Sequence, residues 1–517
     1  MGHTEQQESA ANGGPSGASE IRFQLRGSSL LLVGRVIAVG LNFLTQVLIA
    51  RYLPTTEYGA FTYALSIVAL VGGFVGLGSD RAISRFLPIY DESSDTPRFF
   101  GTLALVVALV LGVGATVALV ILGLQSSLVF GVVPDRLTMS VVALMIFLAP
   151  IEALDGVLTD TFAVFRSTKA IFVRKYILAP SFRVAVVLLL ILNDADVHFL
   201  AGGYLATGLA GVLLYISLLP ALFERARLTW RGTSFRLRVP LREIAAYTTP
   251  LLTIDVLLLS MSSLDAILVG QMHGIDEVAR LKVVESTAKL NAIVFSTFTI
   301  LLTPAIARLF ARQDREQLRD LYWRTAAWIA VASFPIFVAT FSLATPVTVL
   351  LFGERYRSSG LILAALALAR YVDAAFGANG QTIRMFGGVR EIVVVNLLTA
   401  GLHLGLALLL IPVYGAMGAA IAILISFVIY NVLKQVALRR VTGIPMFERA
   451  YLRVYGLVAV VTGAVAALEL SVNPPLPVAI PLAIVAIAIV FLSARRALRI
   501  ADIFPEIGRL PGFRHLR

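Results

Sequence analysis

The stretch that decides the fold is the basic linker Glu224-Arg-Ala-Arg-Leu-Thr-Trp-Arg-Gly-Thr-Ser-Phe-Arg-Leu-Arg-Val-Pro-Leu-Arg242, near the middle of the chain. It carries six arginines against one acid, and long apolar segments with few charges flank it on both sides. Loops rich in Lys and Arg between membrane spans are retained in the cytoplasm. We therefore predict that this linker is cytoplasmic and that it separates two membrane-embedded halves.

The composition of the whole chain is that of a membrane protein. Of its 517 residues, 58% are hydrophobic and 14% are charged, whereas soluble domains are about half apolar and about a quarter charged. The net charge of +12 would suggest nucleic acid in a soluble protein. Here most arginines fall in short loops, so the charge indicates membrane topology and anionic lipid headgroups, and no nucleic-acid partner. The chain has no cysteine, which excludes disulfides and cysteine metal sites.

About fourteen apolar stretches are long enough to cross a bilayer, which takes roughly 20 residues of helix. They cover residues 28–53, 57–77, 100–124, 138–165, 170–192, 197–223, 243–272, 277–305, 322–352, 358–385, 391–411, 415–437, 452–470 and 476–493. The loops alternate between cation-rich and cation-poor, with exceptions at Arg136, Arg355 and Arg357. This alternation predicts an even number of spans in the plasma membrane, with both termini in the cytoplasm.

An internal repeat divides the spans into two sets. One copy reads Gln46-Val-Leu-Ile-Ala-Arg-Tyr-Leu-Pro-Thr-Thr-Glu-Tyr-Gly-Ala-Phe61, and the other Ala266-Ile-Leu-Val-Gly-Gln-Met-His-Gly-Ile-Asp-Glu-Val-Ala-Arg-Leu281. Each is a span, a tight outer turn with a Glu (Glu57 or Glu277) that caps the next helix, and a second span. A basic amphipathic stretch, Arg81–Tyr90, ends the first copy. Both copies start on the same side, which favours two bundles that rock around a cavity.

These observations predict an all-α membrane protein with two pseudo-symmetric six-helix bundles around a central cavity and two further C-terminal helices. The predicted divisions are a disordered cytoplasmic tail (1–27), the first bundle (28–223), the linker (224–242), the second bundle (243–437), two extra transmembrane helices (438–493) and a basic cytoplasmic tail (494–517).

Four cations lie deep inside predicted spans, where an ionisable residue is costly and faces a cavity or a partner by default. They are Arg35, Arg183, Lys289 and Arg370. We predict that they bind a phosphate headgroup, and Arg is suited to paired phosphate contacts. The alternative is neutralisation inside the bundle, since Glu285 lies one turn before Lys289, and Asp373 shares a helical face with Arg370.

The acids inside spans form a second set: Glu152, Asp155, Asp160 and Asp255. Asp155 and Asp255 are candidates for coupling to Na⁺ or H⁺, as an ion-driven transporter requires. The alternative, which the many nearby arginines favour, is structural ion pairing. His403 is alone in its span and is interpreted as a hydrogen-bonded packing residue. Arg174 and Lys175 lie near the inner face, where we expect them to snorkel toward headgroups.

No nucleotide-binding loop, zinc-protease motif or Ser-His-Asp order stands in a suitable context. We therefore expect no enzyme activity, no metal and no cofactor. Ions, the membrane potential or the cargo gradient must then supply the driving force.

The order of several short motifs resembles a known family. They are Phe43-Leu-Thr-Gln-Val-Leu-Ile-Ala-Arg-Tyr-Leu53, Gly78-Ser-Asp-Arg-Ala-Ile-Ser-Arg-Phe-Leu87, Asp265-Ala-Ile-Leu-Val-Gly270, Leu351-Phe-Gly-Glu-Arg-Tyr356 and Ile411-Pro-Val-Tyr-Gly-Ala-Met-Gly-Ala-Ala420. Together they resemble the Wzx-like polysaccharide biosynthesis proteins, the oligosaccharide flippases of the multidrug/oligosaccharidyl-lipid/polysaccharide exporter (MOP) superfamily. The resemblance implies that the chain flips a polyprenyl- or dolichyl-(pyro)phosphate-linked sugar from the inner to the outer leaflet.

The same resemblance bears on the cargo and the partners. Arg35 matches an arginine in the first span of the lipid II flippase, but Val36 stands where that relative has an acid, so lipid II itself is not the expected cargo. The expected partners are the lipid-linked oligosaccharide, membrane lipids, and glycosyltransferases or a polymerase of the same pathway, with the chain itself a monomer. The last two spans are expected to provide a groove for the lipid tail.

Two other functions remain open. A multidrug or cation antiporter of the same superfamily would favour an acidic cavity, which the deep Arg and Lys residues argue against. A multispanning glycosyltransferase or polymerase would need a sizeable outer loop with catalytic groups, and every predicted outer loop is short.

Overall fold

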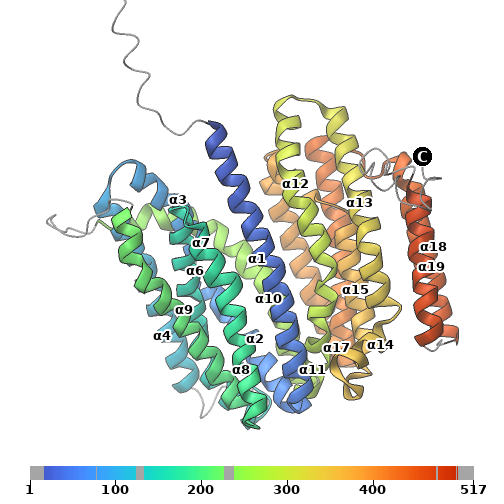
Figure 1. Cartoon of the computed structure of the whole chain (residues 1–517), viewed down its shortest axis with the longest axis horizontal. Coiled ribbons are helices and arrows are strands. Elements are labelled where there is room, and N and C mark those ends of the chain that lie inside the picture. The colour runs from blue at the N-terminus through green and yellow to red at the C-terminus, as the bar shows by residue number, and fades with distance from the viewer. Residues whose placement is uncertain are drawn as a thin grey trace, which may run out of the picture. The chain divides into compact units, whose positions relative to one another are not determined.

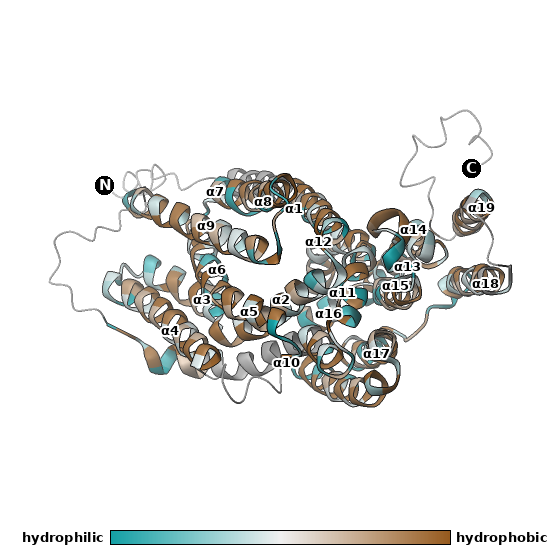
Figure 2. Cartoon of the chain, turned by 90° about the horizontal axis from the view of Figure 1, so that it is seen from below, coloured by the Kyte–Doolittle hydropathy of each residue, from teal (hydrophilic) through white to brown (hydrophobic). Residues whose placement is uncertain are grey.

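All regular secondary structure in the described part of the chain is helical (Figure 1). This computed structural model describes the backbone of residues 17–76, 78–123, 133–225, 238–472, 476–495 and 498, and their side chains apart from 17–32, 225, 247, 249–262, 300–301, 304, 469–470, 472 and 476. Eleven helices in these ranges are long and apolar enough to cross a membrane, and hydrophobic residues dominate helices such as α4 and α17 (Figure 2). The predicted class, an all-α membrane protein, is confirmed, while the count of fourteen spans stays a prediction.

The helices follow one another with short connections. Before the central linker they are α1 (Gly17–Tyr52), α2 (Thr55–Gly76), α3 (Ser79–Glu92), α4 (Thr96–Gly123), α5 (Arg136–Met145), α6 (Leu148–Val164), α7 (Thr168–Ile171), the π-helix η4 (Phe172–Leu178), α8 (Ala179–Leu192) and α9 (Val197–Arg225). After it they are α10 (Leu241–His273), α11 (Ile275–Lys289), α12 (Asn291–Ala311), α13 (Arg315–Phe341), α14 (Ala344–Phe352), the 3₁₀ helix η5 (Glu354–Tyr356), α15 (Ser359–Ala375), α16 (Asn379–Met385), α17 (Val389–Thr442), α18 (Arg449–Val472) and α19 (Leu476–Ala494).

Several boundaries differ from the predicted ones. Helix α1 begins at Gly17, inside the stretch predicted as a disordered tail, because hydropathy marks the part of a helix that can sit in lipid and not its ends. The predicted span 138–165 is divided between α5 and α6, and the span 277–305 between α11 and α12. Most of the central linker (226–237) and the C-terminal tail beyond residue 498 lie outside the described residues.

The chain sorts into two compact units. Unit 1 comprises Met1–Leu48, Val75–Ala118 and Phe147–Thr249, and unit 2 comprises Ile49–Phe74, Leu119–Ile146 and Pro250–Arg517. Unit 2 thus joins the turn between α1 and α2 to the second half of the chain. The predicted bundles, 28–223 and 243–437, follow different limits and stay predictions.

Helix α3 in unit 1 is the amphipathic basic segment predicted from the sequence. Gly78 precedes it in the left-handed conformation, with φ 66°, which glycine adopts without steric cost. One face buries Ile83, Phe86 and Leu87, while Arg85 lies exposed on the other. The predicted amphipathicity is confirmed.

In unit 2 the turn between α1 and α2 packs closely on the second half of the chain. Arg51, in the last turn of α1, donates from Nε to the carbonyl oxygen of Leu351 at the end of α14, at 2.8 Å. Arg355 in turn donates from Nη2 to the carbonyl oxygen of Arg51, at 2.8 Å. Cations are favoured at helix C-termini, where the last carbonyls lack partners within the helix. Each arginine therefore caps the helix that ends beside it.

The motif Ile411–Ala420, one of those that carry the family resemblance, contains a kink in α17. Gly415 leaves the helical conformation, with φ 55° and ψ −131°. The break leaves backbone groups on both sides without the hydrogen-bond partners that a continuous helix would give them. His273 bonds through Nε2 to the carbonyl oxygen of Ile411, at 2.8 Å, and Glu277 Oε2 accepts from the amide of Ala416, at 3.2 Å. The prediction that Glu277 caps α11 is wrong, because its carboxylate serves the broken end of α17 instead.

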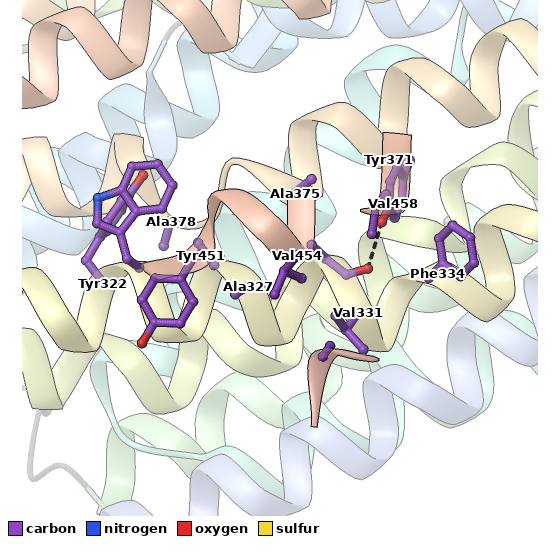
Figure 3. Packing of buried hydrophobic residues seen from close by; sticks show 14 of the residues in the cluster. Tyr322, Ala327, Val331, Phe334, Tyr371, Ala375, Ala378, Tyr451, Val454 and Val458 are labelled. Carbon is purple, nitrogen blue, oxygen red and sulfur yellow. Dashed lines mark hydrogen bonds between the residues drawn. The ribbon is translucent and has the colours of Figure 1, made fainter. Parts of the chain in front are cut away.

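The core of unit 2 extends from α13 and α15 onto α18. Ala327, Val331 and Phe334 of α13 lie close to Val454 and Val458 of α18 (Figure 3). Close van der Waals packing of this kind, rather than exclusion of water, holds helices together in lipid. Packing thus fixes α18, one of the two extra C-terminal helices, against α13.

Candidate functional site

A cavity of about 250 Å³ lies inside unit 2. Its walls are Asp265 of α10; Leu281, Lys282 and Glu285 of α11; Leu366 and Arg370 of α15; and Asn396, Thr399, His403, Ile423, Ser426, Phe427 and Tyr430 of α17. The α17 residues fall at helical spacing on either side of the kink, so each half of this helix turns one face to the cavity. Ionisable groups from four helices thus meet in one small chamber.

Arg370 is the predicted headgroup cation that lies in this cavity. Its guanidinium stacks 4.7 Å from the centre of the Phe427 ring, and no carboxylate pairs with it among the described residues. Asp373, the expected neutralising partner, accepts instead from Lys434 Nζ at 3.3 Å and from Asn431 Nδ2 at 3.0 Å. A planar guanidinium held by an aromatic ring keeps its in-plane donors for an anion.

Lys289 is placed differently from Arg370. Its Nζ lies 2.7 Å from Glu285 Oε1, and Lys282 Nζ lies 2.9 Å from the other oxygen of the same carboxylate. One acid therefore serves two ammonium groups, which leaves this cluster with a net positive charge. Lys289 is half exposed and does not line the cavity, whereas Lys282, which was not among the predicted cations, does.

The two predicted cations of unit 1 also differ from each other. Arg183 Nη2 lies 3.5 Å from Glu152 Oε1, and its guanidinium is 5.2 Å from the centre of the Tyr204 ring. Arg35 is exposed on α1, and no acid of the described chain pairs with it. Glu152 thus partly compensates the charge of Arg183, whereas the charge of Arg35 has no carboxylate partner among the described residues.

Arg174 is buried, so the prediction that it snorkels to the surface is wrong. Its Nη2 donates to Asp155 Oδ1 at 2.7 Å, and its guanidinium lies 5.7 Å from the centre of the Tyr215 ring. Gly211 makes room for it, since a Cβ there would lie 1.5 Å from Nη2. The partner carboxylate lies on another helix, so charge attraction turns the side chain inward rather than toward headgroups.

This pair bears on the predicted ion-coupling acids. Asp155 is the acid bound to Arg174, which matches the structural alternative to ion coupling. Asp255 lies in the part of α10 whose side chains are outside the described residues. No group of three or more His, Asp or Glu side chains in the described ranges is arranged to hold a metal ion.

His403 is buried and hydrogen-bonded, in agreement with its interpretation as a hydrogen-bonded packing residue, and its partners come from outside its own span. Its Nε2 lies 3.1 Å from Asp265 Oδ1, and its Nδ1 lies 3.1 Å from Ser426 Oγ. Asp265 belongs to a motif that was quoted for the family resemblance and not weighed as an intramembrane acid. The available signal was that both residues are ionisable and lie within predicted spans, where such groups tend to find one another.

An apolar groove of about 450 Å³ lies elsewhere in unit 2. Residues of α13, α15 and α18 line it, among them Phe337, Tyr371, Tyr455 and Gly463. The Tyr371 hydroxyl donates to the carbonyl oxygen of Ala330 at 2.9 Å (Figure 3). The polar atom of this lining residue therefore has a partner within the protein.

Comparison with solved structures shows which fold this is. The chain is similar to the lipid II flippase MurJ in an inward closed conformation, with TM-score 0.67 and 12% identity over 93% of this chain and 99% of that one. It is also similar to an inward-facing MATE family multidrug resistance transporter of the MOP superfamily, with TM-score 0.61 and 16% identity over 78% and 94% of the two chains. A third similar structure is that of the MATE multidrug transporter DinF-BH, with TM-score 0.59 and 12% identity over 83% and 97%.

Comparison at the level of sequence gives the family. No curated protein matches the chain significantly. The sequence profile of the family described as "Polysaccharide biosynthesis protein" matches residues 24–310, more than half of the chain. With this match and the fold shared by MOP transporters and flippases, the chain belongs to the polysaccharide biosynthesis protein family.

Proposed function

We propose that this protein is a flippase that moves a polyprenyl- or dolichyl-(pyro)phosphate-linked oligosaccharide from the cytoplasmic to the outer leaflet by alternating access. The product would serve surface polysaccharide or glycoprotein biosynthesis. The observation that carries the proposal is Arg370, a cation inside a cavity of unit 2 with no carboxylate partner among the described residues. Such a charge is costly within a membrane protein unless it meets water or an anion. The phosphate of a lipid carrier supplies that anion.

The groove between α13, α15 and α18 fits the other end of such a cargo. Its lining is largely apolar and aromatic, which suits a hydrocarbon chain that cannot form hydrogen bonds. We propose that the lipid tail rests here while the headgroup engages the cations.

The remaining parts of the proposal follow from the loop charges and the family. The protein would act as a monomer in the plasma membrane with both termini cytoplasmic, beside glycosyltransferases or a polymerase of its pathway. Na⁺ or H⁺ coupling is part of the proposal, and neither an enzyme activity nor a nucleic-acid partner is.

An ion-coupled multidrug antiporter is the second candidate. The observations that favour it are the likeness to MATE transporters and two acids, Asp265 and Glu285, in the cavity wall. However, Glu285 is held between two lysines, so the wall does not present an acidic surface. Efflux of a cationic dye from cells that express the protein, with surface glycan unaffected by its deletion, would favour this candidate.

Replacing the cavity arginine tests the leading proposal. Arg370→Ala is expected to lower surface glycan about ten- to a hundredfold, because a hydrogen bond to a charged group contributes about 1.5–3 kcal/mol. Arg370→Lys should recover part of it, since the charge remains but the paired contacts are lost. Surface glycan and membrane-inserted protein are measured together. We expect Arg35→Ala to act in the same direction.

The matched control is Arg357→Ala, which removes an exposed arginine that pairs with Glu354. It should leave surface glycan unchanged. Normal glycan in Arg370→Ala cells with wild-type protein levels would refute the headgroup role.

Filling the apolar groove tests the tail site. Gly463→Phe puts a ring where no atom lies within 4 Å of the added Cβ, on the wall of the groove. Binding of a fluorescent polyprenyl phosphate to the purified protein is expected to weaken at least about tenfold, since several buried CH₂ groups at about 0.8 kcal/mol each would be displaced. Gly456→Phe, at an equally open site on α18 that does not line the groove, is the control. Equal binding by both variants would place the tail elsewhere.

A further inference from the structure

Three side chains from two helices form a hydrogen-bonded chain in the cavity wall. Asp265 comes from α10, and His403 and Ser426 come from the two halves of α17. The imidazole lies between the other two, with both ring nitrogens at 3.1 Å from an oxygen. The side chains of Asp265 and His403 are each 5% exposed, and Ser426 is buried as well. The mechanism proposed above uses none of the three.

The chemistry of this chain tolerates two protonation states. With a neutral ring, Nε2–H donates to Asp265 and the Ser426 hydroxyl donates to Nδ1. After a proton arrives, Nδ1–H donates to the same hydroxyl oxygen, because a serine can be either donor or acceptor. Neither state leaves a buried polar atom without a partner, so no desolvated group opposes the change. A backbone carbonyl in place of the Ser426 hydroxyl could only accept and would favour the protonated ring. A Lys there could only donate and would favour the neutral ring.

The ionisable groups that share the cavity wall with His403 come from each of the four helices that line it. Helix α10 contributes Asp265, α11 contributes Lys282 and Glu285, α15 contributes Arg370, and α17 contributes the phenol of Tyr430. Glu285 is already paired with lysines. With Asp265 ionised and His403 neutral, the pair carries a net charge of −1 that becomes zero when a proton binds, in the same cavity as the cation of Arg370.

We propose that Asp265, His403 and Ser426 form a proton-binding site, and that proton uptake there strengthens anion binding at Arg370. A bound proton removes the negative charge that competes with an anion in the same cavity. By linkage, an anion at Arg370 must raise the proton affinity of the site by the same factor. The second half of this proposal rests on the proposed function, whereas proton binding does not.

The imidazole favours a proton over an alkali cation. Its nitrogen occupies Asp265 Oδ1, and nitrogen is a poor ligand for hard cations, which need several oxygen ligands. Asn396 Oδ1, a buried oxygen without a partner among the described residues, also lines the cavity, and the exchange of choline for sodium in the test below distinguishes the two ions. Free imidazole changes its charge near pH 6.5.

The test is a histidine titration on the full-length protein in lipid nanodiscs, without cargo. The chain holds five histidines, and His403→Gln identifies the NMR signal of His403. We expect this signal to titrate between about pH 5 and pH 9. Replacing choline by sodium at constant ionic strength should not move the midpoint. A signal that does not titrate, or a midpoint that sodium displaces, overturns the proton site.

Two variants test whether Asp265 is the partner that sets the proton affinity of His403. Asp265→Asn should lower the proton affinity of His403 about ten- to a thousandfold, because an opposite charge at this distance favours the charged imidazole by about 1–3 pH units. Asp196→Asn is the matched control, since Asp196 Oδ2 lies 2.9 Å from Nδ1 of the exposed His198. It should leave the His403 midpoint in place. An unchanged midpoint in folded Asp265→Asn protein contradicts the pair.

Inorganic pyrophosphate probes the coupling. Saturating pyrophosphate is expected to raise the proton affinity of His403 about 5- to 150-fold, and Arg370→Ala should abolish that rise. A rise that survives in Arg370→Ala, or no rise in wild type, overturns the coupling. If the His403 titration is normal but surface glycan is unaffected by Arg370→Ala, the proposed cargo fails while the proton site stands.

Discussion

Removing Arg174 alone is expected to destabilise the protein by about 3–5 kcal/mol, because it leaves the partner carboxylate of a buried pair without compensation. The side chains of Arg174 and Asp155 are 7% and 26% exposed, and their atoms lie 2.7 Å apart. Removing both partners, in Arg174→Met with Asp155→Leu, should restore most of the loss, because apolar residues of similar volume often replace such pairs at no cost. Unfolding of the two single variants and the double variant in detergent gives the coupling energy directly.

The neighbouring Lys175 provides the control for this cycle. It is exposed, so Lys175→Met should change the unfolding free energy by less than about 0.5 kcal/mol. The double variant also decides the role of Asp155. If it exports glycan with an unchanged dependence on Na⁺ and pH, Asp155 is structural. Loss of that dependence in stable protein would instead assign Asp155 to ion coupling.

Gly59→Ala is expected to destabilise unit 2 by about 3 kcal/mol, the upper end of the range for overpacking. A Cβ at Gly59 would lie 2.3 Å from the carbonyl oxygen of Ile275, the first residue of α11. A backbone atom at a helix start cannot rotate away as a side chain can. The two repeats meet through this contact, since Gly59 belongs to the first copy and Ile275 to the second. Thermal unfolding and the yield of membrane-inserted protein measure the effect.

Gly72→Ala is the matched control on the same helix. No atom lies within 4 Å of the Cβ it adds, so the variant should gain up to about 1 kcal/mol from the better helix propensity of alanine. Equal unfolding temperatures for the two alanine variants would show that the backbone around Ile275 accommodates the added Cβ without loss of stability, which would contradict the prediction.

The features that follow from local sequence were predicted well. Hydropathy and span length gave the helical membrane class, and the amphipathic pattern of Arg81–Tyr90 gave α3 with its buried face. The ordered short motifs gave the family that the sequence profile confirms. These signals need only neighbouring residues, since a helix one turn long already places its apolar and charged residues on different faces.

Pairings between distant residues were predicted poorly. Asp373 was the alternative partner proposed for Arg370 because the two share a helical face, yet it pairs with Lys434 of another helix. Glu277 was expected to cap its own helix, yet it binds the kinked α17. In each case the local partner competes with one that only helix packing brings near, and local spacing cannot say which is closer.

The sequence by itself determined that the chain is a helical membrane protein of the polysaccharide biosynthesis family, because apolar length, loop charge and short motifs are properties of contiguous residues. Only the tertiary structure decided which buried charges form ion pairs and which have no carboxylate partner among the described residues. Arg174 turns inward to Asp155, His403 joins Asp265 and Ser426, and Arg370 keeps its charge in a cavity. The physical reason is that the energy of a buried charge depends on the groups within a few ångströms of it, and helix packing draws those groups from distant parts of the chain.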